Sequence, residues 1–225
     1  DSLRRPTAAS EAKRPKPDAL AVCTIPGCGR PTEARQGNGF SPFLCRYHRE
    51  HRSRHGSPLK RSYTAAELRP YLKAAESVVK ANTAEQYIGW SLASISSLLA
   101  SAGPVRRVVD LGKLSPETKA KASLAMLRER NVPPERILAV TLAVLAAITE
   151  DPFGPGGDRV LFRRVQIAKA LRRRASGTHV VYEGTGIRWD RYPRSSGRVL
   201  EHLGAVVEAA CEFAIDRHVA VVLDL

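Results

Sequence analysis

The chain has 225 residues, enough for one medium-sized domain and a small appendage. With 43% hydrophobic and 26% charged residues, it has the composition of a globular protein, so most of it is expected to fold. Its 36 Lys and Arg against 22 Asp and Glu give a net charge of +14, which points to a polyanionic partner such as DNA or RNA. The longest apolar run, residues 137–148, is too short to span a bilayer and predicts a buried helix, so no membrane role is expected.

The positive charge is concentrated at the start of the chain. Residues 1–61 carry 13 Lys and Arg and 5 Asp and Glu, a net charge of +8, and the other 164 residues carry the remaining +6. Residues 1–20 are rich in Pro, Ala, Lys and Arg and almost lack large apolar side chains. Such a segment cannot bury enough surface to offset the entropy of ordering, which predicts a flexible basic arm.

Three of the four cysteines lie within residues 23–45 and are followed by a histidine at metal-ligand spacing. The first two cysteines are separated by four residues that include Pro-Gly, which favours a tight turn. The third is separated from the histidine by two residues, which places both side chains on one face of a helix. Zinc binds such donors in closed tetrahedral structural sites. The predicted zinc ligands are Cys23, Cys28, Cys45 and His48.

Other histidines and the fourth cysteine leave alternatives open. His51 and His55 follow on the same predicted helix, and either could replace His48 as the fourth ligand. Cys211 lies in an apolar helical stretch and is expected to be a buried core thiol. The cysteines form no paired disulfide framework and no signal peptide is recognisable, so we expect a cytoplasmic protein that is nucleoid-associated if it binds DNA.

The segments around these ligands read CTIPGCGRP at residues 23–31, LCRYH at residues 44–48, and Arg52 followed by RHGSP at residues 54–58. They resemble a small zinc-binding module of phage and bacterial mobile-element proteins that is often found beside HNH endonuclease domains. The resemblance covers about residues 21–58 and implies the same four metal ligands. The central loop, residues 35–42, is longer than in that module.

Beyond residue 62 the apolar spacing is that of amphipathic helices. Thr64 and Glu67 form a capping box, Ser115 precedes a proline at the first helical position, and Asp158 can cap a later helix. The predicted elements are helices at about 64–80, 83–102, 115–130, 133–150, 159–174 and 196–217, an extended piece at 105–111, a β-hairpin of residues 178–183 and 187–192, and a last strand at 219–223.

The expected fold class is therefore mainly α. A treble-clef- or knuckle-like zinc module at residues 21–61 precedes a helical domain at residues 62–225 that carries the hairpin near 178–192. A hairpin after a basic helix has the order of a winged helix, in which the helix enters a DNA major groove and the hairpin is the wing. The alternative is an ordinary solvated helix.

Basic side chains in two regions are the candidates for contact with phosphates. The group around the zinc module consists of Arg30, Arg46, Arg49, Arg52, Arg54, Lys60 and Arg61. The group on the helix at residues 159–174 consists of Arg159, Arg163, Gln166, Lys169 and Arg173. Because the second group falls within roughly a third of the helical circumference, that helix could present one basic face to base edges and phosphates.

The sequence lacks the motifs of common enzyme classes, namely a Gly-rich phosphate loop, a nucleophile motif and an HNH-type metal cluster. We interpret the chain as a non-enzymatic, zinc-containing nucleic-acid-binding protein of a phage or other mobile element, with DNA preferred over RNA. One alternative is an assembly or adaptor subunit that docks other proteins through its helical domain, with a purely structural zinc ion. A second alternative is a nuclease or recombinase accessory protein.

Overall fold

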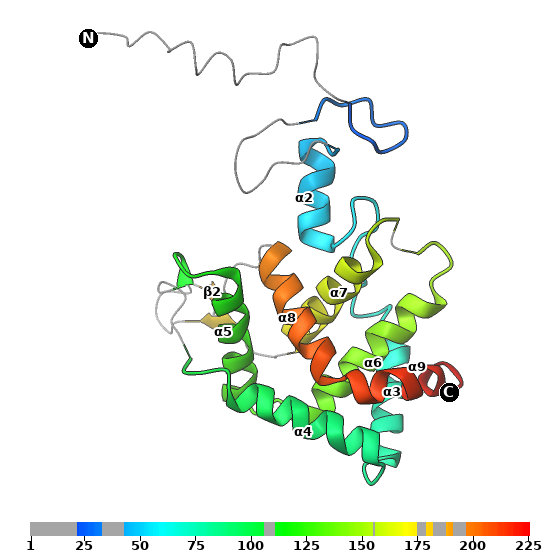
Figure 1. Cartoon of the computed structure of the whole chain (residues 1–225), viewed down its shortest axis with the longest axis vertical. Helices are drawn as coiled ribbons and strands as arrows, with labels where there is room; N and C mark the ends of the chain where they lie inside the picture. Colours follow the sequence, from blue (N-terminus) through cyan, green and yellow to red (C-terminus); the bar gives the residue numbers. More distant parts are fainter. Residues whose placement is uncertain are drawn as a thin grey trace, which may run out of the picture. The chain divides into compact units, whose positions relative to one another are not determined.

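The computed structural model of the chain describes residues 22–32, 43–105, 111–154, 156–174, 179–181, 188–190 and 197–225 (Figure 1). The chain divides into two compact units, Asp1–His51 and Arg52–Leu225. The division falls inside helix α2 (Arg46–His55), ten residues before the boundary expected from the sequence. The predicted arm at 1–20, the loop at 35–42 and most of the extended piece at 105–111 lie outside the described residues.

The larger unit is mainly helical, as the sequence predicts (Figure 1). Helix α6 contacts α3, α4, α7 and α9, and α8 contacts α4, α5, α7 and α9, so these two helices form the centre of the unit. The helices of this unit are α3 (Arg69–Ala81), α4 (Gln86–Ala100), α5 (Pro116–Glu129), α6 (Pro134–Glu150), α7 (Arg159–Arg174), α8 (Gly197–Ala210) and α9 (Glu212–Leu223).

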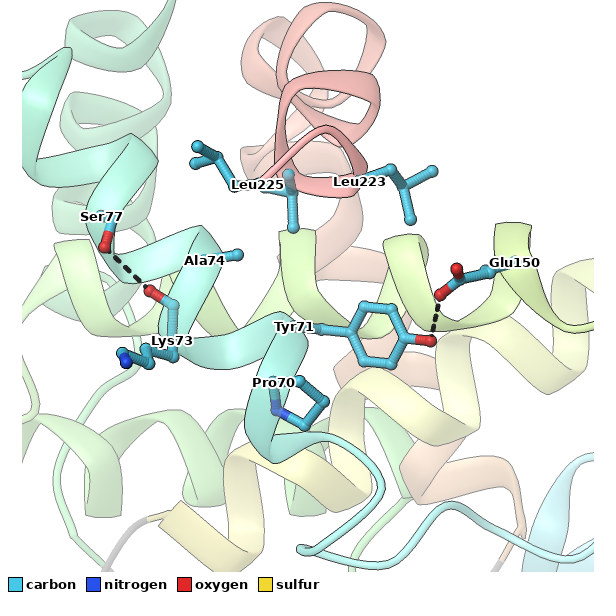
Figure 2. A pocket seen from close by; sticks show the side chains of 9 residues that line it. Pro70, Tyr71, Lys73, Ala74, Ser77, Glu150, Leu223 and Leu225 are labelled. Atoms are coloured by element: carbon cyan, nitrogen blue, oxygen red, sulfur yellow. Dashed lines mark hydrogen bonds between the residues drawn. The ribbon is translucent and has the colours of Figure 1, made fainter.

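Helix α6 is the apolar centre of the core. All of residues 137–148 are buried, which confirms the prediction for this run, since a helix that is apolar on every side is stable in water only when it is surrounded. At its last residue, Glu150 accepts a hydrogen bond from the Tyr71 hydroxyl, which connects α6 to α3 (Figure 2). Across the ranges that the structure describes, no helix has both the length and the apolar character needed to cross a membrane.

The capping contacts predicted from the sequence are present at three places, and at Ser115 and Asp158 a helix begins as predicted. Thr64 and Glu67 form the reciprocal capping box, with the Thr64 amide 2.6 Å from Glu67 Oε2 and the Glu67 amide 3.2 Å from Thr64 Oγ1. Ser115 and Asp158 each accept the amide three residues later, at 3.2 and 3.0 Å. The regular part of α3 begins only at Arg69, because Pro70 has no amide hydrogen to continue the ladder from the capping box.

The C-terminal prediction is wrong in two respects. The expected helix at 196–217 is interrupted at Cys211, and the expected strand at 219–223 is part of helix α9. Ser91 of α4 explains the interruption, because its hydroxyl donates to the Cys211 carbonyl at 3.4 Å and accepts the Ala214 amide at 3.1 Å. The buried residues of α9 are Ala214, His218 and Val222, a spacing of four that packs a helix and not a strand against the core.

Two short strands, β1 (His179–Val181) and β2 (Arg188–Asp190), pair in antiparallel orientation, with Val180 opposite Trp189. They fall where the sequence places the two halves of a hairpin. Residues 182–187, which would form its turn, lie outside the described residues, so the structure shows a three-pair ladder and not the complete hairpin.

Candidate metal centre

The first two predicted ligands lie on a tight turn of the smaller unit. Gly27 and Gly29 have φ angles of 74° and 59°, in the left-handed region that glycine adopts without strain. The Cys28 amide donates to the Ile25 carbonyl at 3.0 Å, and the Cys23 amide donates to the Arg30 carbonyl at 2.9 Å. The chain therefore reverses between the two cysteines, which brings both sulfurs to one side.

The other two ligands lie at the start of α2. The Arg49 amide donates to the Cys45 carbonyl at 2.9 Å, so Cys45 immediately precedes the first turn and His48 follows within it. Thr24 connects the two halves of the site, because its amide and its hydroxyl both donate to the Phe43 carbonyl, at 2.8 and 3.0 Å. The sequence contains no pattern that identifies this brace.

The four ligand atoms have the spacing of a metal tetrahedron. All lie within 4.8 Å of one another: Cys23 Sγ and Cys45 Sγ are 3.4 and 3.5 Å from His48 Nδ1, and Cys28 Sγ is 3.7 Å from Cys45 Sγ. Typical Zn–S and Zn–N bond lengths place tetrahedral ligands about 3.8 Å apart for two sulfurs and about 3.6 Å apart for a sulfur and a nitrogen. The site can therefore hold a metal ion, and its dimensions are compatible with zinc.

The local hydrogen bonds favour the thiolate at Cys23. Burial raises the pKa of this thiol, but backbone hydrogen bonds at Cys45 and Ile25 and side-chain hydrogen bonds with His48 and Cys28 outweigh burial and lower the pKa to about 6. A thiolate is the form in which cysteine binds metal ions. Cys23 and Cys45 are 6% and 2% exposed, so water has little access to these two sulfurs.

The alternative fourth ligands do not belong to the cluster. Over the described parts of the chain, the one group of metal-binding side chains contains His48 and neither His51 nor His55. His55 Nδ1 accepts the Ser62 amide at 3.0 Å and lies 3.0 Å from the Ser62 hydroxyl. The fourth cysteine, Cys211, is fully buried elsewhere, and burial raises its pKa to about 12, as expected of a core thiol.

Exposed arginines and an aromatic ring surround the metal-binding residues. The Arg30 guanidinium lies over the Tyr47 ring, 5.2 Å from its centroid, and the Tyr47 ring meets the His48 imidazole edge to face at 5.1 Å. Tyr47 is 57% exposed. Arg46 is exposed and forms an ion pair with Glu50 at 3.0 Å, one turn along α2. Arg30 and Arg46, two of the basic side chains predicted to contact phosphates, therefore lie at the surface of this unit.

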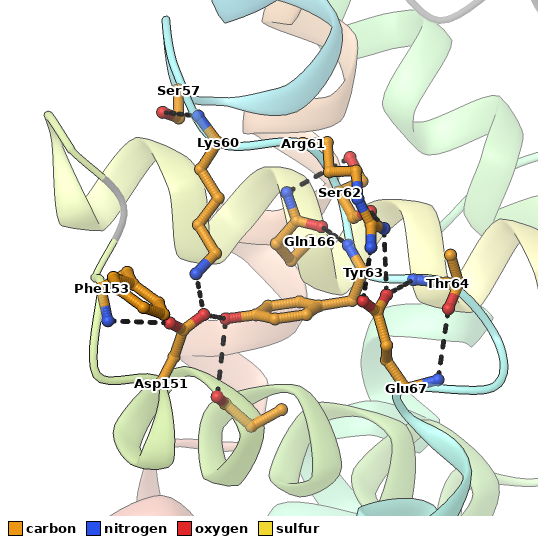
Figure 3. A network of polar contacts seen from close by, with 11 residues as sticks. Ser57, Lys60, Arg61, Ser62, Tyr63, Thr64, Glu67, Asp151, Phe153 and Gln166 are labelled. Carbon is orange, nitrogen blue, oxygen red and sulfur yellow. Dashed lines mark hydrogen bonds and ion pairs between the residues drawn. The ribbon is translucent and has the colours of Figure 1, made fainter.

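Helix α7 does not present the exposed basic face that the sequence suggests. Gln166 is 2% exposed, and its amide nitrogen donates to the His55 carbonyl at 2.7 Å. Its side-chain oxygen accepts the Tyr63 amide at 3.2 Å (Figure 3). Lys169 donates to the Ser62 hydroxyl at 2.8 Å. The side chains of Gln166 and Lys169 therefore hold residues 55–63 against the helix. Because Gln166 is buried by these contacts, it is no longer a candidate for contact with nucleic acid.

Several other basic candidates have carboxylate partners. Lys60 pairs with Asp151, which also accepts the Tyr63 hydroxyl at 2.7 Å (Figure 3). The remaining pairs are Arg61 with Glu67, Arg163 with Glu208, and Arg52 with Asp158. Arg49 is partly buried, whereas Arg54, Arg159 and Arg173 are exposed. Four of the predicted phosphate contacts, Arg52, Lys60, Arg61 and Arg163, are therefore paired with carboxylates within the fold.

Comparison with known proteins adds no relative, since no family model, no curated protein and no solved structure matches the chain. The resemblance of residues 21–58 to the zinc-binding module of mobile-element proteins stays a prediction. The site is consequently defined by its own geometry: three sulfurs and one imidazole nitrogen at tetrahedral spacing, on a turn and a helix start.

Proposed function

We propose that Cys23, Cys28, Cys45 and His48 bind a structural zinc ion and that the unit they organise binds nucleic acid, DNA in preference to RNA. The observation that carries the proposal is the convergence of the four ligand atoms, which all lie within 4.8 Å of one another. Three of the distances between them, 3.4, 3.5 and 3.7 Å, agree to within a few tenths of an ångström with the separations expected of tetrahedral zinc ligands. All four positions of the tetrahedron are supplied by the chain. A closed site of this kind favours a structural role over a catalytic one, which needs an open position.

The finer features of the zinc unit are also part of this proposal. A cysteine-bearing turn, followed by a helix with Cys45 just before its first turn and His48 within that turn, favours a treble-clef- or knuckle-like module. The resemblance in residues 21–58 supports a phage or mobile-element source, and a DNA-binding protein of that kind would be cytoplasmic and associated with the nucleoid. Docking of α7 as a winged-helix recognition helix has little support, because Gln166 lies in the core.

Charge supports the choice of nucleic acid as the partner. Residues 1–61 carry a net charge of +8, and the exposed Arg30–Tyr47 pair beside the metal ligands joins a cation to a flat aromatic ring. Such a pair can contact a phosphate through the guanidinium and stack on a base through the ring. Contacts of this type bind nucleic acid with little dependence on sequence.

Titration of short duplexes and single strands onto the zinc-loaded chain tests the proposal. Affinity should fall steeply between about 50 and 200 mM salt, with a logarithmic slope of about 0.9 for each neutralised phosphate. Arg30→Glu should weaken binding more than the matched charge reversal Lys121→Glu on α5, which lies in the other unit. Absence of binding to every nucleic acid at low salt, with zinc bound, refutes the proposal.

The adaptor alternative is favoured by one exposed aromatic cluster. Trp90 of α4 and Phe213 of α9 are 44% and 46% exposed and meet edge to face at 5.4 Å. Tyr87 extends the cluster on α4, and the Arg217 guanidinium lies 4.0 Å from its ring centroid. Exposed aromatic side chains are enriched at protein interfaces. A partner whose affinity is lost in Trp90→Ala and is nearly independent of salt supports this second function.

A further inference from the structure

A groove on the larger unit is lined by basic side chains from three helices. It has a volume of about 440 Å³. Arg69 and Lys73 lie one turn apart on α3, Arg136 lies in the first turn of α6, and Arg173 lies in the last turn of α7. Arg69 and Arg173 are more than a hundred positions apart in the sequence, and the packing of α6 against α3 and α7 brings these residues together.

The groove contains more positive than negative charge. Its single acidic lining residue is Glu76, which forms an ion pair with Arg136. Arg69 and Lys73 are exposed, and neither side chain forms an ion pair or a hydrogen bond with a described residue. Arg173 donates to the Tyr63 carbonyl, which fixes the guanidinium in place without neutralising it. The groove therefore carries a net charge of about +3 when its arginines and lysine are protonated.

The excess of positive charge continues along the end of α7. The pKa of Lys169 is lowered to about 8, first by burial and then by the positive charges of Arg173, Arg172 and Arg54. Repulsion between neighbouring cations, which lowers their pKa values, destabilises the folded unit. A bound anion relieves this repulsion. Arg173 belongs both to this group and to the groove, so the positive charge beside the groove extends beyond its lining residues.

The neighbouring groove shows that this charge is local. It shares Lys73, but its other side chains include Tyr71, the carboxylate of Glu150 and the apolar Leu223 and Leu225 (Figure 2). An anion would meet one cation and one carboxylate there. The basic groove thus differs from its neighbour in both the number and the convergence of its cations.

We propose that the basic groove of Arg69, Lys73, Arg136 and Arg173 binds phosphate groups of a nucleic-acid backbone. Guanidinium groups donate paired hydrogen bonds that match phosphate oxygens, and the groove is larger than one phosphate, as a continuous strand requires. This inference rests on the proposed function, since it names a second contact for the same nucleic acid. It assigns the larger unit a direct part in binding, through Arg173, which the sequence singles out, and through Arg69, Lys73 and Arg136, which it does not.

Charge reversal at the two exposed, unpaired residues tests the groove. Arg69→Glu with Lys73→Glu should weaken duplex or single-strand binding by the zinc-loaded full chain at least tenfold and lower the salt slope by about two, one for each lost phosphate contact. The matched control, Lys80→Glu with Lys121→Glu, changes the net charge equally at exposed sites outside the groove and should weaken binding less than threefold. Equal effects of the two pairs overturn the proposal.

A second variant, which removes the two charges without reversing them, covers the case in which the double reversal does not fold. The variant Arg69→Gln with Lys73→Gln replaces the double reversal if that protein fails to fold, and its expected effect is at least threefold. If the wild-type chain binds nucleic acid and neither groove variant binds more weakly, the groove proposal fails and the proposed function stands.

If the wild-type chain binds no nucleic acid, the proposed function fails, and titration with inorganic phosphate and pyrophosphate decides what the groove does. Amide NMR shifts around residues 69–73 that disappear in the variant would show a site for free phosphate, which overturns the backbone assignment. The absence of such shifts would overturn the groove as an anion site altogether.

Discussion

Replacing Cys45 by serine removes one ligand of the candidate metal centre. This change should unfold the smaller unit and leave the larger unit folded. The described residues of this unit include only three buried side chains, those of Cys23, Thr32 and Cys45, so they form no apolar core that could hold the fold without metal. Structural zinc contributes about 10–16 kcal/mol to folding of comparable small modules. The folding free energy lost with one thiolate ligand should therefore be larger than the stability that so small a unit has without the ion.

The assay combines zinc analysis with amide NMR spectra of the full chain. Wild-type protein should contain one zinc ion and lose the dispersed signals of residues 22–32 and 43–51 when a chelator is added. Cys45→Ser should show the same loss without chelator, while signals of the larger unit keep their positions because that unit has its own core. The matched control, Cys211→Ala, removes a core thiol and should keep the zinc. Dispersed signals in metal-free protein would refute the reasoning.

Three further predictions concern the larger unit. A Cβ atom at Gly204 would lie 2.0 Å from a backbone oxygen of α7, so Gly204→Ala should destabilise the unit by about 3 kcal/mol in chemical denaturation, whereas Gly89→Ala, in open space on α4, should not destabilise it. Hydrogen bonds from Arg61 hold the pKa of Glu67 at about 2, below its ordinary 4.5, so this carboxylate stabilises the fold above pH 4.5 and loses its effect as the pH falls towards 2. Because the Arg61–Glu67 pair is exposed, the free energy of unfolding should fall by about 1 kcal/mol between those pH values. Unfolding curves at each pH measure this change, which should be absent in Glu67→Gln. Burial lowers the pKa of Lys169 to about 8, below its ordinary 10.5, so the free energy of unfolding should rise from pH 8 to 10.5, and Lys169→Met should flatten that rise.

Local signals in the sequence predicted much of the structure. The capping box at Thr64, the caps at Ser115 and Asp158, and the buried run at 137–148 each depend on side chains a few residues apart, and each is confirmed. The metal cluster was predictable for the same reason. Its ligands form two short pairs, and the donor types restrict what can bind them.

Long-range contacts account for the errors. The break at Cys211 depends on Ser91, which is far away in the sequence, and no pattern near residue 211 indicates it. The strand expected at 219–223 was inferred from an apolar run, but packing against α3, α4 and α6 favours a helix there. Gln166 looked accessible on a helical wheel and is buried because residues 55–63 cover it.

The sequence by itself determined the three cysteines of the candidate metal site, the net positive charge and the mainly helical class, since these follow from residue types and short spacings. The structure selected His48 over His51 and His55 as the fourth member of that site. Tertiary structure decided which cations are neutralised inside the fold and which, such as Arg69 and Lys73, converge on an open groove. The physical reason is that the energy of a charge depends on which other charges lie near it in space and on the distances to them. Helix packing sets both, because it brings together residues that are far apart in the sequence.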